Sequence, residues 1–370
     1  MQGQEETISL YEGTVPEFVA GELERLYRNP YCTLLHHALH GALDGGTGAY
    51  VARRDGEVSA VLLFRRHGET LRVLNEQLRI DAAEVDRFAR HVFAAFAGVN
   101  IIDLNAVAIR GGALTLPAQH FRCTEDIVLE LPATTEAYRA RLGKATRSYV
   151  SRYLNRLRKD FPDMRHEFVD GAHVAEEDLL AIIRMNAARM QGKRHESYID
   201  AEETRRILTM VRQHGMASLL RLNGRLCAGA INLHYRGSYF LKVIAHDPAY
   251  DSYRLGTLCC FLNICACIER GGDEYHFLWG RYEYKYRLAG VQRDLEHIAL
   301  YRSRAQMLRH ARLAMRNAVT GARMEARDWL LAKVREQGSM GAVLRRTVHA
   351  LKKLRQGGAL ETRPPARDGG

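Results

Sequence analysis

The sequence of 370 residues predicts an α+β protein built from two halves with the same order of elements, followed by a basic helical extension. In both halves, short runs of β-branched and aromatic residues are separated by two-residue turns that end in glycine, a pattern typical of antiparallel strands. Segments with apolar residues at helical spacing lie between these runs. Residues 302–370 contain 16 Lys plus Arg against 5 Asp plus Glu, and therefore carry the whole formal net charge of +11.

The first half begins with a strand and with a helix that has Pro16 in its first turn. Three strands follow, with Asp55-Gly56 and His67-Gly68 as hairpin turns. A second helix and a last strand complete this half. We expect the strands at 7–11, 50–53, 58–64, 70–74 and 100–104, and the second helix at 82–96.

The second half repeats this order after a seam between residues 105 and 125, where Gly111-Gly112 and Pro117 interrupt the strand pattern. We expect strands at 126–131, 165–169, 217–222, 226–235, 239–245 and 275–278. We expect helices at 135–161, 176–190, 201–214 and from Gly256 onward. The expected domains are 1–120, 121–303 and 304–370, of which the last is helical to about residue 355 and ends with a disordered composition.

The most informative stretch runs from His246 to Leu288. A strand ends at Pro248, a turn brings Gly256 to the start of a helix, and the next strand leads into a Gly-x-x-x-Tyr-Lys segment. The N-terminus of a helix presents backbone N–H groups without partners, and a residue without a Cβ atom lets an anion approach them. The pattern therefore predicts that a phosphate group binds at Gly256.

This pattern resembles the GNAT acyltransferase superfamily, in particular the CelD/BcsL-type acetyltransferases of bacterial polysaccharide loci, and more distantly the FemABX aminoacyltransferases. The resemblance covers about residues 125–303 and implies tandem GNAT-like domains, the first of them degenerate. Leu255 stands where many relatives have proline, and Arg281 stands where an acidic residue often follows the glycine. The residues that match are Asp247, Pro248, Tyr250, Gly256, Phe277, Gly280, Tyr284 and Lys285.

The resemblance implies an acyltransferase that uses acetyl-CoA or another acyl-CoA as co-substrate. An amine or hydroxyl of a glycan-type or small-molecule acceptor would attack the thioester directly, without a covalent enzyme intermediate. The backbone of the strand at 239–245 would polarise the thioester carbonyl. A role in exopolysaccharide biosynthesis follows from the same resemblance.

Each expected role in this reaction has its own set of residues, and we expect no metal. The cofactor set is Gly256, Arg254, Thr257 and Lys242. The catalytic set is Lys285, Glu283, Asp247 and Tyr284. The set that binds the acceptor is Arg281, Arg287, Arg152 and His195.

A structural role remains open for several of these residues. Gly256 could only relieve packing between helix and strand, and Asp247 could only cap its own turn. Glu283 could be no more than an ion-pair partner of Lys285, and Arg152 could belong to the solvated face of an amphipathic helix. The cysteines at 259, 260, 265 and 267 lack zinc-site spacing and are expected to be buried apolar residues.

Two other functions remain open. The first is FemABX-like transfer of an amino acid from aminoacyl-tRNA, in which the basic tail would meet RNA. The second is a non-catalytic GNAT-fold adaptor whose basic tail binds an anionic surface. No apolar run is long enough to cross a bilayer and no secretion signal is recognisable, so we expect a cytoplasmic protein whose tail contacts the inner membrane face.

Overall fold

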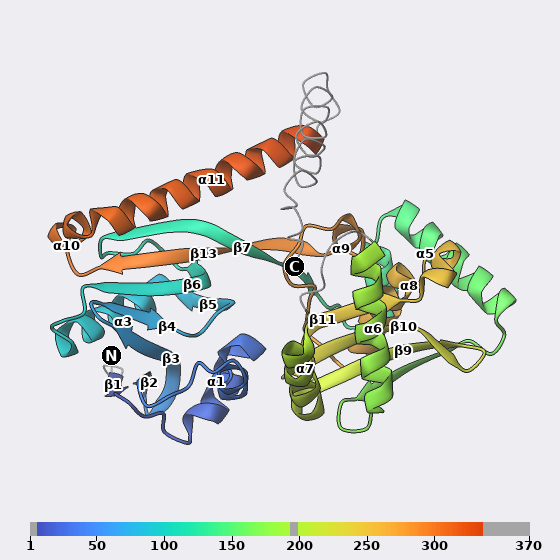
Figure 1. The fold of residues 1–370 in the computed structure, drawn as a ribbon, viewed down its shortest axis with the longest axis horizontal. Coiled ribbons are helices and arrows are strands. Elements are labelled where there is room, and N and C mark those ends of the chain that lie inside the picture. Colours follow the sequence, from blue (N-terminus) through green and yellow to red (C-terminus); the bar gives the residue numbers. More distant parts are fainter. Residues whose placement is uncertain (1–5, 193–198, 336–370) are drawn as a thin grey trace, which may run out of the picture. The chain divides into compact units, whose positions relative to one another are not determined.

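The computed structural model describes residues 6–192 and 199–335 (Figure 1). The chain divides into two compact units, Met1–His310 and Ala311–Gly370. The first unit contains both predicted halves, and the second begins with a single long helix. None of the described helices is both long enough and apolar enough to span a bilayer.

The first half of the large unit is a sheet of five strands with a further short strand at its side. Its helices are α1 (Val19–Tyr27), η1 (Pro30–Cys32), α2 (Leu34–Leu39) and α3 (Ala82–Ala95). Its strands are β1 (Glu6–Tyr11), β2 (Thr47–Arg54), β3 (Glu57–His67), β4 (Thr70–Val73), β5 (Leu78–Asp81) and β6 (Ile101–Arg110). Strands β2, β3 and β4 are antiparallel, and α3 then crosses over to β6, which is parallel to β4.

The second half repeats this order with longer helices. Its helices are α4 (Thr135–Arg141), α5 (Lys144–Asp160), α6 (Glu176–Gly192), α7 (Ala201–His214), η2 (Pro248–Tyr253), α8 (Leu255–Glu269) and α9 (Glu283–Arg287). Its strands are β8 (Arg165–Asp170), β9 (Gly215–Leu222), β10 (Arg225–Tyr235), β11 (Ser238–His246) and β12 (Glu274–His276). Strands β9, β10 and β11 are antiparallel, and α8 crosses over to β12, which is parallel to β11.

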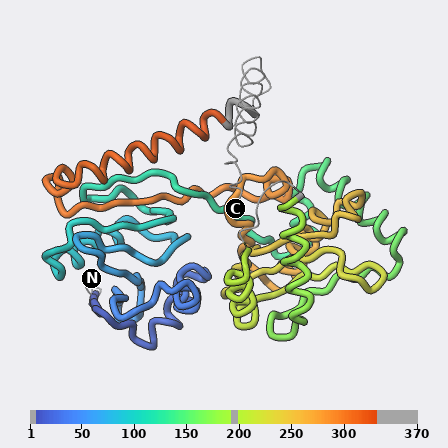
Figure 2. The backbone as a smooth tube through the Cα atoms, in the orientation of Figure 1, coloured from blue at the N-terminus to red at the C-terminus, as the bar shows by residue number. Residues whose placement is uncertain are grey.

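Two long strands, β7 (Ala118–Glu130) and β13 (Val291–Tyr301), join the halves. They are antiparallel partners and lie side by side although they are far apart in the sequence (Figures 1 and 2). Strand β13 also pairs with β6 of the first half, and β7 pairs with β12 of the second. The result is one sheet of 13 strands that is mostly antiparallel, unlike a doubly wound parallel sheet. The predicted α+β architecture with two similarly ordered halves is confirmed.

Helices cover both faces of the second half of the sheet. On one face, α8 packs with α4 and α5 over a core that includes Leu154, Leu241 and Phe261. On the other face, α6 and α7 enclose a core that includes Ile182 and Phe240. The two faces of β11 are therefore distinct environments.

The structure differs from the sequence prediction in five places. Strand β5 was not predicted, and β7 begins at Ala118, inside the predicted seam at 105–125. The predicted helix at 135–161 is broken into α4 and α5 because Gly143 takes an extended conformation before α5. The predicted strand at 275–278 ends at His276, after which Leu278 adopts a positive φ of 59°. Strand β13 was not predicted, because charged residues interrupt its apolar pattern.

The predicted helices of the tail are confirmed as far as the structure describes them. They are α10 (Arg304–Arg309) and α11 (Ala311–Arg335). Positions 336–370, which include the rest of the predicted helical tail, lie outside the described residues.

Candidate functional site

The pairing of β11 with β12 ends partway along β11. Their parallel ladder has only three pairs, from Ser238 with Glu274 to Phe240 with His276. Beyond this ladder, at residues 241–246, β11 pairs with no strand of the described part of the chain on that edge, although Asn186 of α6 donates a hydrogen bond of 3.2 Å to the carbonyl of Ile244. The register of β11 with β10 skips Lys242, which marks a β-bulge. A bulge bends its strand, and this accounts for the end of the pairing.

The N-terminus of α8 lies next to His246, the last residue of β11. The residue before the helix, Arg254, has a positive φ of 58° and makes no side-chain cap. The N–H groups of Thr257 and Leu258 donate to the carbonyl of Arg254 at 3.1 and 3.2 Å. Among the described residues, the N–H groups of Leu255 and Gly256 have no acceptor. Free N–H groups at the start of a helix with 15 residues form an anion site.

Gly256 is needed for packing as well. A Cβ atom on this residue would lie 2.9 Å from Nδ1 and 3.2 Å from Cε1 of His246. The same imidazole is fixed through its Nε2 atom, which is 2.7 Å from Oδ1 of Asp251. The bare backbone of Gly256 therefore serves the contact with His246 and also leaves the helix start open.

Cationic side chains surround this helix start. The hydrogen bond from Arg254 lowers the pKa of Tyr153, and the guanidinium of Arg152 lies 4.9 Å from the centre of the same ring. Burial raises the pKa of Tyr149, while its hydrogen bond with Thr257 and the nearby charges of Arg254 and Arg287 oppose the rise. Arg152 and Arg287, predicted to bind the acceptor, thus lie with Arg254 and Thr257, which were predicted to bind the cofactor.

The side chain of Lys242 lies apart from this group. Its Nζ atom is 2.8 Å from Oε1 of Glu203 on α7, and both side chains are largely buried. The α7 face of the sheet is opposite the face that α8 covers. The backbone of Lys242 therefore forms the bulge of β11, while its charge is directed toward Glu203.

Lys285 fixes the chain segment that follows β12. It is 3% exposed, and its Nζ atom donates to the carbonyls of Phe277, Leu278 and Trp279 at 2.8, 3.1 and 2.6 Å. An ammonium group has three N–H donors, so all of them are used. Burial lowers the pKa of Lys285 to about 8. This geometry favours a role in positioning the chain after β12 over direct contact with an acceptor.

The remaining predicted catalytic residues have structural partners. Glu283 is exposed and pairs with Arg287 at 2.6 Å, so its ion-pair partner is not Lys285. Asp247 accepts a hydrogen bond from the N–H of Ala249 at 3.0 Å and one from Arg225 at 2.8 Å. Tyr284 packs against the core beneath α8, and burial raises its pKa.

The last two residues of the acceptor set are Arg281 and His195. Arg281 pairs with Glu125 at 3.2 Å, and both side chains are mostly buried. Glu125 also accepts a hydrogen bond of 3.1 Å from the N–H of Gly280, so it fixes the turn after β12. His195 lies outside the described residues.

Residues 144–286, which include α5, β11, α8 and β12, match the sequence profile of a family described as "Acetyltransferase (GNAT) domain". The chain contains a GNAT-superfamily acetyltransferase domain. None of the curated proteins compared with this sequence matches it.

Solved structures with a similar fold include "Crystal structure of FemX", with 9% identity, a TM-score of 0.55, and coverage of 80% of this chain and 96% of that chain. A tandem GNAT protein from the clavulanic acid biosynthesis pathway has 11% identity and a TM-score of 0.36, with 80% and 98% covered. The C-terminal domain of a putative lysylphosphatidylglycerol synthetase from Agrobacterium fabrum has 12% identity and a TM-score of 0.44, with 70% and 84% covered. At these identities the similarity concerns the fold alone.

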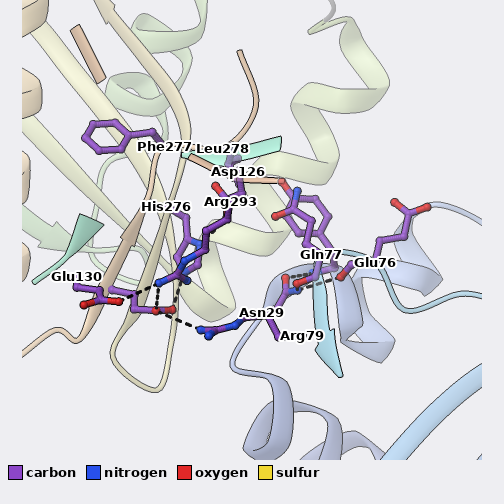
Figure 3. Close-up of polar contacts among 12 residues, drawn as sticks. Asn29, Glu76, Gln77, Arg79, Asp126, Glu130, His276, Phe277, Leu278 and Arg293 are labelled. Carbon is purple, nitrogen blue, oxygen red and sulfur yellow. Dashed lines mark hydrogen bonds and ion pairs between the residues drawn. The ribbon is translucent and has the colours of Figure 1, made fainter. Parts of the chain in front are cut away.

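One polar cluster of the large unit was missed in the sequence (Figure 3). Nδ1 of His276 is 2.6 Å from Oδ2 of Asp126, and Nε2 of His276 is 3.3 Å from Glu274. Glu274 also pairs with Arg293 at 2.7 Å. The sequence offered little signal for this cluster, because charged and polar residues occur throughout both strands: β12 reads Glu-Tyr-His, and Asp126 follows Thr124 and Glu125 in β7.

Electrostatics couples the members of this cluster. Burial alone would lower the pKa of His276, but the carboxylates of Asp126 and Glu274 raise it above its usual value. The hydrogen bond to His276 and the charge of Arg293 hold the pKa of Glu274 below its usual range, against the effect of burial. The cluster therefore places an imidazole with a raised pKa between two carboxylates, at the last pair of the β11–β12 ladder.

Within residues 6–192 and 199–335, no group of three or more His, Cys, Asp or Glu side chains could hold a metal ion. The four cysteines of α8 are buried and free, and burial raises the pKa of each thiol. In the GNAT domain these cysteines are part of the apolar core between α8 and the sheet.

Proposed function

We propose that this protein transfers an acetyl or other acyl group from acyl-CoA to an amine or hydroxyl of a glycan-type or small-molecule acceptor. One observation carries the proposal. Strand β11 pairs with β12 only as far as Phe240, and the end of β11 lies against the start of α8, where the N–H groups of Leu255 and Gly256 have no acceptor among the described residues. An elongated molecule with a phosphate at one end and a hydrogen-bonding chain at the other fits this combination, and acyl-CoA is such a molecule.

The donor would be held at two points. Its pyrophosphate would accept hydrogen bonds from the N–H groups of Leu255 and Gly256, with Arg254, Arg152 and Arg287 supplying positive charge. Its amide-bearing arm would lie along β11 beyond the end of its ladder with β12. The thioester would then reach the point where the β11–β12 ladder ends, and backbone groups of β11 would polarise its carbonyl.

Transfer would be direct. The nucleophilic nitrogen or oxygen of the acceptor attacks the thioester carbonyl carbon, the C–S bond breaks, and the acceptor's proton leaves so that the products are the acylated acceptor and CoA. Holding donor and acceptor together lowers the entropic part of the barrier. The ion pairs of Glu283 and Asp247 would have to open before either could accept that proton.

Finer features of the proposal come from the resemblance of the two motifs to CelD/BcsL-type enzymes. They are a glycan-type acceptor of an exopolysaccharide locus, a cytoplasmic location, and contact of the basic tail with an anionic membrane surface. The proposed domain boundaries are residues 1–120, 121–303 and 304–370.

A second candidate is FemABX-like transfer from aminoacyl-tRNA. The observation that favours it is the fold similarity to FemX over 80% of this chain. The acyl carbon would again be attacked by an amine, but the leaving group would be the ribose hydroxyl of tRNA. The arginines around α8 would then bind the RNA backbone.

Titration calorimetry distinguishes these functions. Full-length protein is titrated with CoA, and the titration is repeated in the presence of unacylated tRNA. We expect CoA to bind with one site per chain and tRNA to leave this affinity unchanged. Competition by tRNA together with weak CoA binding would favour the second candidate. Absence of both interactions would make the non-catalytic adaptor the leading hypothesis.

A further inference from the structure

A cavity of about 290 Å³ lies between the two halves of the large unit. Tyr27, Asn29 and Gln77 line it from the first half, and Asp126, Phe240 and His276 line it from the joining strand and the second half. The ring of His276 stacks on Phe240 with centroids 4.1 Å apart, and these two residues form the last pair of the β11–β12 ladder. The cavity thus begins where the β11–β12 ladder ends, on the side of α6 and α7.

Two oxygen atoms at this cavity lack hydrogen-bond donors. Asp126 is 6% exposed, and its Oδ2 atom is satisfied by His276. Its Oδ1 atom and the Oε1 atom of Gln77 are buried and have no partner among the described residues. A buried carboxylate or amide oxygen without a donor costs about 1–3 kcal/mol or more. Both atoms are acceptors, whereas Nε of Arg28 and Nε2 of His276 at the same cavity are nitrogen atoms that also lack a hydrogen-bond partner among the described residues. A molecule that satisfies all four atoms both donates and accepts hydrogen bonds.

The chain holds Gln77 in place at some cost. Gln77 has a positive φ of 53°, which is unfavourable for a residue with a side chain. Asn29, which is 4% exposed, donates through Nδ2 to the carbonyls of Glu76 and Gln77 at 2.9 Å each. A buried clamp that maintains a strained residue beside an unsatisfied carboxylate indicates a built binding site.

The charges around the cavity differ from one wall to the other. Glu274 is neutralised by Arg293 at 2.7 Å and by His276 at 3.3 Å. Arg79 and Arg110 have longer ion pairs, 3.8 Å to Glu274 and 3.6 Å to Asp81, and about half of each side chain is exposed (Figure 3 shows Arg79 beside the cluster). These two guanidinium groups can turn toward a carboxylate at the mouth of the cavity.

We propose that this cavity binds a small amino-acid-like molecule. Its ammonium group donates to Oδ1 of Asp126 and Oε1 of Gln77, and its carboxylate faces Arg79 and Arg110. Because Phe240 and His276, the last pair of the β11–β12 ladder, line the cavity, the bound amine is the acceptor; this last step rests on the proposed function, whereas the binding itself does not. The site needs residues from both halves, which gives the first half a role in choosing the acceptor.

The test uses full-length protein without CoA and three probes of equal length, 6-aminohexanoate, hexylamine and hexanoate. Calorimetry or ligand-observed NMR measures binding. We expect 6-aminohexanoate to bind most tightly, hexylamine more weakly, and hexanoate not at all. Binding of hexanoate as tightly as 6-aminohexanoate would overturn the proposal, because the ammonium group would then contribute nothing.

Two variants address the acceptor atoms directly. Gln77→Met removes Oε1 with little change in size, and Asp126→Asn removes the charge while retaining an oxygen. Each should weaken 6-aminohexanoate at least tenfold. Glu130→Gln is the matched control, because Glu130 is exposed, pairs with Arg293 at 3.4 Å and does not line the cavity. Unchanged binding in both Gln77→Met and a folded Asp126→Asn would reject the site.

CoA titrations of the same proteins separate this proposal from the proposed function. If CoA binds but 6-aminohexanoate does not, the cavity proposal fails and the acyltransferase proposal stands. If 6-aminohexanoate binds and depends on Gln77 but CoA does not bind, the acyltransferase proposal fails and the cavity proposal stands. Binding of both, with Gln77→Met affecting only 6-aminohexanoate, supports both.

Discussion

Gly256 and His246 are in such close contact that a Cβ atom on the glycine would lie 2.9 Å from Nδ1 of the imidazole. Replacement of Gly256 therefore disturbs His246 whether or not a phosphate binds there. Any test of the helix start as a phosphate site must separate these two effects.

A double-mutant cycle achieves this separation. We expect Gly256→Ala to weaken CoA binding in the parent protein, because the methyl group displaces His246 and the helix start with it. In the His246→Ala background the methyl group has room, so Gly256→Ala should cost less than about 0.5 kcal/mol if only packing matters. A persistent loss of about 1 kcal/mol or more, measured by calorimetry with CoA, would support direct contact with the phosphate.

Lys285 gives a prediction about stability. Lys285→Met leaves the carbonyls of Phe277, Leu278 and Trp279 without their donor, and we expect a loss of about 2–4 kcal/mol in unfolding free energy at pH 7. Distortion of the chain after β12 should lower turnover more than it weakens CoA binding. Urea denaturation and calorimetry with CoA measure the two effects. A variant as stable as the parent would show that the three hydrogen bonds contribute nothing.

Lys285 also predicts a pH dependence with a definite sign. Its pKa falls from 10.5 to about 8 in the folded protein. Between these values the unfolded chain binds more protons than the folded chain, so this residue makes stability rise with pH. The parent should therefore gain stability relative to Lys285→Met as the pH increases from 8 to 10. An equal slope for both proteins would contradict the lowered pKa.

The sequence predicted the local features well because local chemistry determines them. The hairpins β9–β10 and β10–β11 turn at Asn223-Gly224 and Arg236-Gly237, and all four residues have the positive φ that such turns require. The start of α8 at Leu255–Gly256 was likewise readable, because a glycine after a turn marks a helix start.

The charged partners of the site could not be read from the sequence. Asp126 and His276 are 150 residues apart, and Glu125 and Arg281 are 156 residues apart. Their contacts depend on β7 lying next to β12, and periodicity indicates that a strand exists without identifying its neighbours. For the same reason the sequence suggested free cations at Arg281 and Lys285, whereas the structure provides partners for both.

The cluster around His276 predicts a second pH effect. The pKa of Glu274 is lowered from 4.5, so its contribution is present above that value and is lost as the pH falls through the folded pKa. The pKa of His276 is raised from 6.5, so its contribution is present below that value and is lost as the pH rises through the folded pKa. Both contributions are complete between pH 4.5 and 6.5.

Glu274→Gln tests this window. We expect the variant to be less stable by about 1–3 kcal/mol near pH 5.5 and the difference to shrink at more acidic and more alkaline pH. Urea denaturation across the range measures it. Glu130→Gln, which removes an exposed partner of Arg293, should show no such maximum. A difference that does not vary with pH would indicate that Glu274 acts through packing alone.

The basic tail gives the last prediction. Residues 321–370 contain 11 Lys plus Arg against 5 Asp plus Glu. If the tail binds an anionic surface, the full-length chain should sediment with vesicles containing phosphatidylglycerol at low salt, and a chain ending at Thr320 should do so several-fold less. The Debye length falls from about 10 Å at 0.1 M salt to about 3 Å at 1 M, so binding should disappear at high salt. Neutral phosphatidylcholine vesicles are the control. Equal vesicle binding by both chains at low salt would assign the interaction to another surface, and equal CoA affinity would show that the truncation leaves the GNAT domain intact.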